Sequence, residues 1–326
     1  GNCPFTNTLT IVSGLLRIGD GGVLGSGNFG TNIVNNGELV YASSIVQTNS
    51  GLITGSGNLT VSGSAPLTLS GTNTFTGLTL VTNGTLRLGS ASALGSTGTG
   101  TVIAPSGILE LGSMPTGIVY AAEALELRGK LSCKNPGTNT VGYISNNISY
   151  GAISMYNNAV LDVGPGSFLF VGASTPDLGS NTVTKTGLGT LRFTGDPNHR
   201  SVFTVAEGTV ELVHSGSTDA PWLISPGATL RQINAGDLGG YFVQANGTLD
   251  LQSNGSIGGL SGIGLVTNSG ASAITLTVGN NNQSGDFSGV IRNGALAHWI
   301  KYGAAEHRLA YDTSGNLLQL NTYPAT

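Results

Sequence analysis

The chain has 326 residues and a formal net charge of −4, and only 9% of its residues are charged. Because an average soluble domain has about 25% charged residues, the 53 glycines and the many serines, threonines and asparagines must supply most of the polarity. The 12 lysines and arginines give no electrostatic footprint for a phosphate backbone or an anionic membrane. We therefore expect no nucleic-acid partner, and 39% hydrophobic residues at regular spacing argue against disorder.

No stretch approaches the roughly 18 consecutive apolar residues of a membrane-spanning helix. The N-terminal GNCPFTNTLTIVSG also lacks the basic and apolar segments of a signal peptide, so the chain fits a processed form without membrane insertion. Cys3 and Cys133 are too few for a disulfide scaffold and lack metal-ligand spacing. In an oxidising compartment they could pair within one chain or between two chains.

A short phrase, Gly-x-apolar-x-apolar, recurs along the chain. Clear copies are SGLLRI (13–18), NGELVY (36–41), NGTLRL (83–88), SGILEL (106–111), EGTVEL (207–212) and NGTLDL (246–251). The first inward apolar residues of these and looser copies are Leu16, Leu39, Leu59, Leu86, Leu109, Leu125, Leu161, Leu191, Val210, Leu230 and Leu249. Their intervals indicate a period of roughly 20 to 25 residues, which is typical of a solenoid.

The local apolar period of two indicates β-strands, and the glycine before each strand suits a sharp corner. The sequence therefore predicts an all-β, single-stranded parallel β-helix (β-solenoid) of about 14 coils of roughly 20 to 25 residues. We expect one continuous domain over 1–326, with less regular coils around 115–180 and a C-terminal repeat at 280–320. Buried asparagine ladders are expected at corners near Asn36 and Asn83.

The residue between the two apolar positions of each phrase should point outward. These residues are Arg17, Val40, Thr60, Arg87, Glu110, Glu126, Asp162, Arg192, Glu211, Arg231 and Asp250, and nine of them are charged. From Arg192 onward their charges alternate in sign, as side chains facing each other on adjacent strands should. We interpret them as a surface ion-pair ladder that fixes register and contributes little stability per pair.

The block VTKTGLGTLRFTG (183–195) resembles the autotransporter-associated β-strand repeat of bacterial surface proteins, and LTLSGTNTFTGLTLVTNGTLRLG (67–89) resembles it more closely. At the C-terminus Lys301 matches Lys185 and Leu309 matches Leu191. The resemblance implies a right-handed β-helix that is secreted or displayed at the cell surface, often adhesive or structural, without catalytic residues. Such precursors end in a membrane β-barrel translocator, for which the repeats leave no room, so we expect that it was removed or that export takes another route.

Other candidate sites are weak. GSGNFG (25–30) matches a dinucleotide-binding motif but precedes a β phrase instead of opening a helix. His199, His214, His298 and His307 form no metal motif. Glu110 and Glu126 would suit a retaining glycosidase if they lay on neighbouring coils about 5 Å apart, but the ion-pair ladder explains them better. We expect no catalytic residue, no cofactor and no metal.

The sequence thus favours a non-enzymatic extracellular structural β-solenoid of a bacterium, a cell-surface or fibre-forming subunit. The strand-like ends TLTIVS and NLLQL show no obvious protection, and exposed strand edges pair readily with other chains. We therefore expect head-to-tail self-association through the terminal coils. The alternative is an adhesin that binds host or environmental glycans, and a polysaccharide-active enzyme is the third hypothesis.

Overall fold

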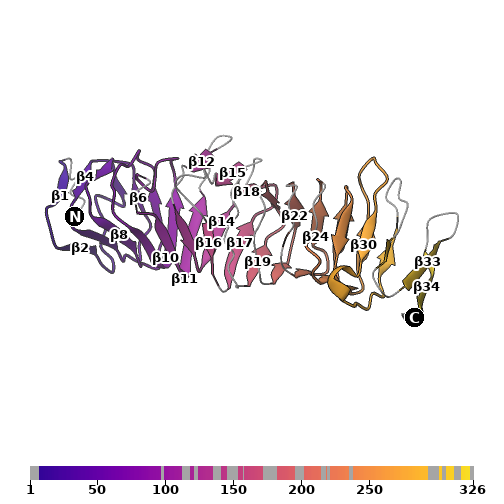
Figure 1. Cartoon of the computed structure of the whole chain (residues 1–326). Coiled ribbons are helices and arrows are strands. Elements are labelled where there is room, and N and C mark those ends of the chain that lie inside the picture. Colours follow the sequence, from indigo (N-terminus) through magenta and orange to yellow (C-terminus); the bar gives the residue numbers. More distant parts are fainter. Residues whose placement is uncertain are drawn as a thin grey trace. The chain divides into compact units, whose positions relative to one another are not determined.

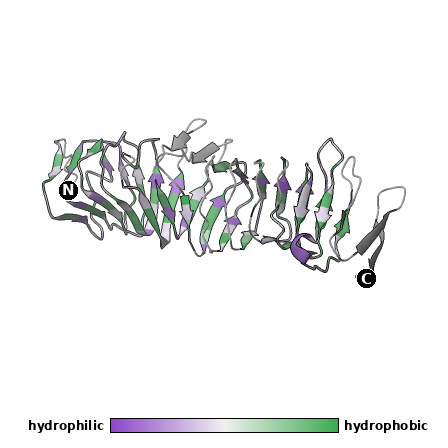
Figure 2. Cartoon of the chain, in the orientation of Figure 1, coloured by the Kyte–Doolittle hydropathy of each residue, from purple (hydrophilic) through white to green (hydrophobic). Residues whose placement is uncertain are grey.

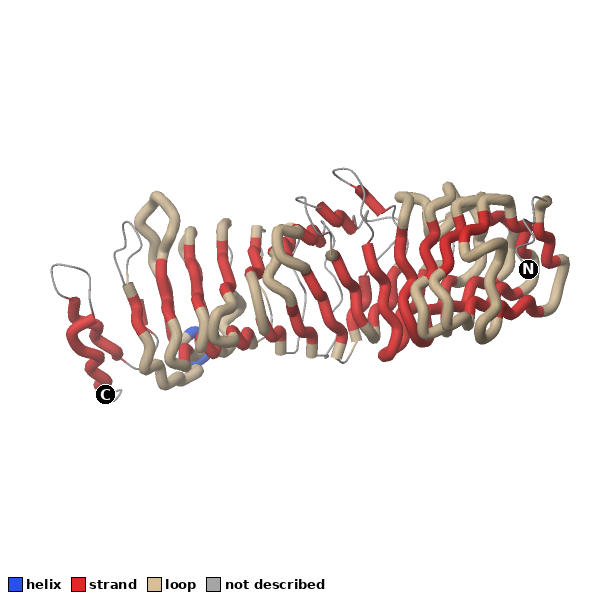
Figure 3. The backbone as a smooth tube through the Cα atoms, turned by 180° about the vertical axis from the view of Figure 1, so that it is seen from behind, coloured by secondary structure: helices blue, strands red, loops and turns tan. Residues whose placement is uncertain are grey.

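The computed structural model divides into two compact units, Gly1–Ser174 and Thr175–Thr326. It describes residues 7–96, 99–111, 118–120, 124–134, 141–144, 153–156, 158–171, 182–194, 202–213, 218, 221–234, 238–292, 301–302, 306–311 and 317–323. Strands dominate these residues, which contain no α-helix and one short 3-10 helix, Asn280–Asn282 (Figure 3). The all-β prediction is therefore confirmed.

The strands of the first unit follow one another closely along the chain (Figure 1). They are β1 (Leu9–Ile11), β2 (Leu15–Ile18), β3 (Asn28–Phe29), β4 (Ile33–Asn35), β5 (Glu38–Tyr41), β6 (Gln47–Asn49), β7 (Ile53–Thr54), β8 (Asn58–Val61), β9 (Leu67–Leu69), β10 (Thr79–Leu88), β11 (Thr101–Leu111), β12 (Ile118–Tyr120), β13 (Leu125–Leu127), β14 (Lys130–Cys133), β15 (Val141–Ile144), β16 (Ile153–Met155), β17 (Ala159–Val163) and β18 (Phe168–Val171).

Two long parallel ladders organise this unit. The first joins β2, β5, β8, the start of β10, the start of β11, β13 and β16. The second joins β3, β6, β9, the end of β10, the end of β11, β14 and β17. Shorter parallel ladders join β1, β4 and β7, and β12, β15 and β18. Each coil thus contributes at least two strands, as a β-solenoid requires.

The two long ladders explain the uneven spacing of the repeated phrase. Leu59 lies in the first ladder, where its partner on the next coil is Thr79. Leu86 lies in the second ladder, where its partner on the preceding coil is Leu67. The step from Leu59 to Leu86 therefore joins two ladders and is not one period. Leu109 and Leu125 also belong to different ladders, which accounts for their short separation.

The second unit repeats the same plan. Its strands are β19 (Val183–Thr186), β20 (Thr190–Phe193), β21 (Phe203–Val205), β22 (Thr209–Leu212), β23 (Trp222–Ile224), β24 (Thr229–Gln232), β25 (Val243–Ala245), β26 (Thr248–Leu251), β27 (Gly255–Ile257), β28 (Leu260–Ser261), β29 (Leu265–Thr267), β30 (Leu276–Val278), β31 (Val290–Ile291), β32 (Lys301–Tyr302), β33 (Glu306–Tyr311) and β34 (Leu317–Tyr323).

One ladder of the second unit joins β19, β21, β23, β25 and β28, and another joins β20, β22, β24, β26, β29 and β31. A third joins β27, β30 and β32. The last two strands, β33 and β34, pair antiparallel with each other. The repeat expected at 280–320 therefore ends in a hairpin, not in a further parallel coil.

The prediction of about 14 coils is too high, because the structure has about 11 turns. Two features of the chain account for the difference. Coils of the first unit lengthen toward β16, where the register partners Leu125 and Ile153 lie further apart in the sequence than Leu16 and Leu39 do. The final hairpin also takes up residues that would otherwise form a coil.

Inward-facing side chains of successive coils stack into apolar rows. In the second unit Leu191, Val210, Leu230, Leu249 and Val266 form one such row, and all five are fully buried. Hydrophobic residues alternate with polar ones along the strands, as the colours of Figure 2 show. Full burial of each such side chain contributes roughly 1.5 to 3 kcal/mol.

Aromatic residues also pack in this core. The rings of Phe203 and Trp222, which are register partners, have centroids 4.8 Å apart, and Phe193 meets Phe203 edge to face at 5.8 Å. The indole Nε1 of Trp222 donates a hydrogen bond to Oγ1 of Thr218 at 3.1 Å, so the ring is buried without losing its polar contact.

Corner glycines stack directly on the backbone of the preceding coil. Gly84 has a φ of +82°, and a Cβ added there would lie 1.8 Å from the carbonyl oxygen of Gly63. Gly208 has a φ of +62°, and its Cβ would lie 2.5 Å from the carbonyl oxygen of Gly187. Both the positive φ and the close backbone exclude a side chain. The same close backbone contact occurs at Gly37, Gly107 and Gly247, and it is the physical reason for the glycine that opens these phrases. Gly14, on the first coil, has nothing within 4 Å of an added Cβ.

Asparagine side chains bind the backbone of the next coil at other corners. Oδ1 of Asn36 accepts a hydrogen bond from the backbone N–H of Ser56 at 3.3 Å, and Oδ1 of Asn58 accepts one from Leu78 at 2.9 Å. Asn36 and Asn83, near which buried ladders were expected, are exposed, but the neighbouring Asn35 is buried and donates to the carbonyl of Asn58 on the next coil at 2.9 Å. The buried asparagines include Asn73, which accepts from the N–H of Ile53 at 2.9 Å and donates to the carbonyl of Ala93.

Replacing Gly84 by alanine should destabilise the first unit far more than replacing Gly166. Both glycines have a positive φ, but a Cβ at Gly166 would meet nothing within 4 Å. We expect Gly166→Ala to cost about 1 kcal/mol from the left-handed backbone alone, and Gly84→Ala to cost on the order of 3 kcal/mol because the backbone must also move. Urea denaturation of both variants measures the difference. Equal losses would show that coil stacking at Gly84 is looser than described.

Candidate functional site

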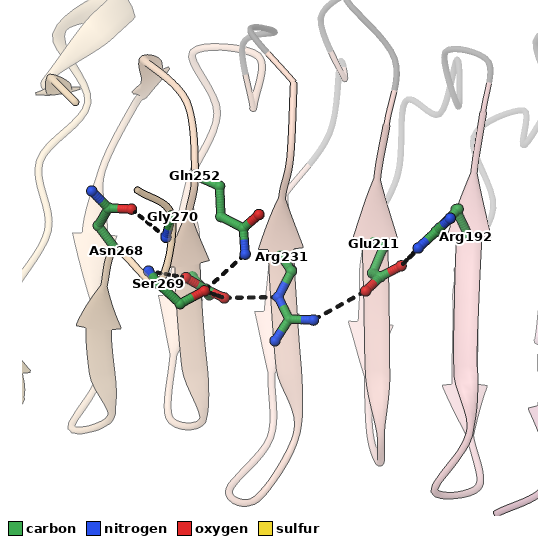
Figure 4. Close-up of polar contacts among 8 residues, drawn as sticks. Arg192, Glu211, Arg231, Gln252, Asn268, Ser269 and Gly270 are labelled. Atoms are coloured by element: carbon green, nitrogen blue, oxygen red, sulfur yellow. Dashed lines mark hydrogen bonds and ion pairs between the residues drawn. The ribbon is translucent and has the colours of Figure 1, made fainter. Parts of the chain in front are cut away.

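Four charged side chains of alternating sign form a continuous chain across strands β20, β22, β24 and β26 (Figure 4). Nε of Arg192 donates to Oε2 of Glu211 at 2.8 Å. Nη1 of Arg231 donates to Oε1 of the same Glu211 at 3.0 Å. Nε of Arg231 donates to Oδ2 of Asp250 at 2.7 Å. Each inner residue of the chain thus contacts partners on both neighbouring coils.

The two carboxylates of this chain are buried, although their side chains lie on the outward row of the strands. Glu211 is 6% exposed and Asp250 is 2% exposed, because the arginine side chains cover them. Burial alone would lower the pKa of Arg231, but hydrogen bonds and charge attraction from Asp250 and then Glu211 outweigh it and raise that pKa. Arg231 therefore stays charged and bridges two carboxylates that have little access to water.

The chain ends on a polar cluster at the next coil (Figure 4). Ser269 donates to Asp250 twice, from its backbone N–H at 2.9 Å and from its hydroxyl at 2.7 Å. Nε2 of Gln252 in turn donates to the Ser269 hydroxyl at 2.8 Å. Sequence reasoning missed Ser269, although it follows Asp250 by the same interval at which Asp250 follows Arg231.

In the first unit the predicted charged residues do not join into one continuous chain of ion pairs in the described part. Nε of Arg87 lies 2.8 Å from Oε1 of Glu110 on the next coil, and both side chains are partly exposed. Asp162 is buried and contacts Nζ of Lys134 at 2.6 Å and Nζ of Lys130 at 3.8 Å. Neither lysine was among the predicted ladder residues.

Two of the predicted positions have apolar or small partners instead of opposite charges. Arg17 is the register partner of Val40. Glu126 is the register partner of Val102 and Ser154, and forms its ion pair with Arg128 of the same coil. The guanidinium carbon of Arg128 lies 4.2 Å above the centre of the Tyr156 ring.

Glu110 and Glu126 belong to different ladders, so they are not facing residues on neighbouring coils. Glu110 has Arg87 and Ser132 as its register partners, whereas Glu126 lies in the first ladder. The placement on which the glycosidase alternative depended is therefore wrong. The error arose because each coil has two outward rows of side chains where the sequence analysis assumed one.

Lys185 is a buried charged residue that the sequence analysis used only as a marker of the repeat. It lies in β19 with its side chain fully inside the second unit. Its Nζ donates to the backbone carbonyls of Gly187, Gly189 and Glu207, the last two at 2.7 and 2.9 Å. The Glu207 carboxylate accepts a hydrogen bond from the N–H of Gly187 at 2.7 Å. Donors and acceptors from two successive coils thus surround one buried charge at this corner.

The remaining candidates take no part in a described site. Cys133 is buried and its thiol donates to the carbonyl of Phe168 at 3.7 Å. Cys3 lies outside the described residues, so a disulfide between the two cysteines stays a prediction. Of the histidines, His199, His214 and His298 lie outside the described residues, and His307 is described only as backbone of β33.

Within the described residues, no three His, Cys, Asp or Glu side chains come together in a group that could hold a metal ion. The glycine motif at 25–30 contains strand β3, and no α-helix follows it in the described residues. The described part of the chain has no helix that is long and apolar enough to cross a membrane.

The ladders, corners and buried polar contacts define a repeat-containing parallel β-solenoid. Residues 59–88 and 183–212 match the family model of the passenger-associated-transport-repeat. The first match runs from β8 to the end of β10, and the second runs from β19 to the end of β22. Each match therefore covers two successive coils. The chain therefore carries repeats of the autotransporter passenger type, which confirms the resemblance seen in its sequence. Neither the curated proteins nor the solved structures contain a significant match.

Proteins with this repeat are generally non-catalytic, and the family implies a secreted or surface protein. The repeats and the solenoid fold fit a passenger-like structural or adhesin protein. Most of the described ion pairs join one coil to the next, which fits a structural protein.

Removing Arg231 should destabilise the second unit much more than removing Arg87 destabilises the first. Arg231→Met leaves two buried carboxylates, Glu211 and Asp250, without their shared cation. Loss of one partner from a buried ion pair typically costs about 3 to 5 kcal/mol. Arg87→Met breaks a more exposed pair, which is typically worth less than about 1 kcal/mol. Urea denaturation monitored by circular dichroism measures both, and similar small losses would contradict the burial of the ladder.

Proposed function

We propose that this chain is a non-enzymatic structural β-solenoid of a bacterial cell surface or extracellular fibre. The observation that carries the proposal is the use of the polar side chains. Arg231, Glu211 and Asp250 bind one another across coils, and corner asparagines such as Asn58 bind the backbone of the coil that follows. Side chains that in an enzyme would face a substrate serve here to hold coils together.

Self-association through terminal coils is the finer part of the proposal. In the described residues β1, β2 and β3 each pair with a strand on one side only. In β2, Leu15 is 59% exposed and Leu16 is half-buried. Leu39, the register partner of Leu16 on the next coil, is fully buried. An open parallel edge with exposed leucines favours pairing with a strand of a second copy. Copies would then associate head to tail.

Electron microscopy and light scattering of the purified chain over a range of concentrations test this assembly. We expect end-to-end particles that lengthen with concentration. Leu16→Asp should shift the chain to monomers, because Leu16 continues the buried row of Leu39 and a charge there would be buried at the joint. Leu188→Asp is the control, since Leu188 is an exposed leucine that lies in a corner of the second unit. Monodisperse wild-type monomers at high concentration would refute the proposed stacking.

A glycan-binding adhesin is the second candidate function, and one row of side chains favours it. Thr190, Thr209, Thr229 and Thr248 are register partners on four successive coils and are all partly exposed. Such a row presents hydroxyl groups at the regular spacing of adjacent strands, about 4.8 Å. A repeating polymer such as a polysaccharide could contact several of them at once.

Glycan-array binding of the wild-type chain tests this second function. If the threonine row binds a glycan, the double variant Thr209→Val, Thr229→Val should lose at least tenfold in affinity. The control Thr48→Val, Thr68→Val changes two register partners in the other unit and should leave binding intact. Absence of saturable binding by the wild type would count against an adhesin role.

A further inference from the structure

The buried ammonium of Lys185 lies at a position that another copy of the repeat fills with an apolar side chain. Lys185 is the third residue of the match at 183–212, and Val61 is the third residue of the match at 59–88. Both side chains point into the core and are almost completely buried. The position is therefore a core position, and a positive charge there needs a specific compensation.

Three backbone carbonyl oxygens supply that compensation. An ammonium group has three N–H donors and no acceptor. The acceptors for Nζ of Lys185 include the carbonyls of Gly187 and Gly189 on its own coil and of Glu207 on the next. Hydrogen bonds to a charged donor are about twice as strong as neutral ones, so convergence of three carbonyls stabilises a cation at this point.

The corner is built so that these carbonyls point inward. Gly187 has a φ of +75°, which only glycine adopts readily. Its N–H is held by the Glu207 carboxylate at 2.7 Å, which ties the two coils together and brings a negative charge to the corner. A Cβ on Gly208 would lie 2.6 Å from Nζ of Lys185, so the absence of a side chain there leaves room for the ammonium group.

We infer that the carbonyl oxygens of Gly187, Gly189 and Glu207 form a cation-binding site, which the tethered ammonium of Lys185 occupies. The site takes a primary ammonium group or another small cation able to sit among three carbonyl oxygens. Its occupant joins two successive coils, since the acceptors come from both. The inference concerns the corner alone and does not depend on the extracellular role proposed above.

Two variants of Lys185 separate the charge from the aliphatic stem. Lys185→Met keeps most of the stem but leaves the three carbonyls without their donor, and a buried carbonyl without a donor destabilises the folded state. We expect the melting temperature to fall by at least about 5 °C. A Lys185→Met variant as stable as the wild type would overturn the inference, because the carbonyls would then need no cation.

Chemical rescue tests the site as a binding site. Lys185→Ala removes both the aliphatic stem and the ammonium group, and so leaves the three carbonyls free to bind an added cation. Added methylammonium should therefore raise the melting temperature of this variant. Tetramethylammonium at the same concentration has the same charge but no N–H donor, and should give no such increase. Val61→Ala is the control, because it creates an apolar cavity at the same position of the other repeat. The two salts should change its melting temperature equally. Equal responses of Lys185→Ala to both salts would contradict a cation site.

Amine labelling of the wild-type chain tests the inference without any variant, and decides it if Lys185→Ala does not fold. Lys130 and Lys134 are partly exposed, with 38% and 55% of their side-chain surface accessible. Reductive methylation followed by peptide mass spectrometry should modify both before Lys185, which should react only on unfolding. Labelling of Lys185 as fast as Lys130 and Lys134 would show that its ammonium is not held by the corner carbonyls.

Discussion

The close contact of glycine corners with the backbone of the preceding coil is the constraint on which the rest of the structure depends. At Gly84 and Gly208 there is no room for even a Cβ between one coil and the carbonyl beneath it. This contact fixes which residue lies above which, and once that register is set, side chains that are one coil apart in the sequence become direct neighbours. Rows of leucine, of threonine and of alternating charge follow from the same register.

The same stacking changes what charged residues do. A glutamate such as Glu211 stands on an outward row, yet the arginines of both adjacent coils cover it. Its ion pairs are thus shielded from water and bind coil to coil. Lys185 shows the same principle inside the core, where backbone carbonyls from two coils surround one ammonium. In both cases polar chemistry serves cohesion between repeats, which supports a structural role for a solenoid carrying passenger-type repeats.

The solenoid class was predictable because the glycine of the Gly-x-apolar-x-apolar phrase indicates a corner, and its alternating apolar residues indicate the strand that follows. The alternation of Arg192, Glu211, Arg231 and Asp250 was readable for the same reason, since each of these residues follows the previous one by a single coil. The sequence could not separate the two ladders of the first unit, because both carry the same phrase. Glu110 and Glu126 were therefore placed on one row. The acceptors of Lys185 are backbone atoms, which leave no signature in side-chain chemistry.

Disulfide formation between engineered cysteine pairs tests the two-ladder register most directly, in a chain whose Cys3 is replaced by serine. Adjacent parallel strands lie about 4.8 Å apart, within the range of Cα separations that a disulfide spans. The pair Arg87→Cys, Glu110→Cys joins register partners and should oxidise readily. The pair Glu110→Cys, Glu126→Cys joins different ladders and should stay reduced under the same conditions. The reverse result would contradict the arrangement of coils from which the whole account follows.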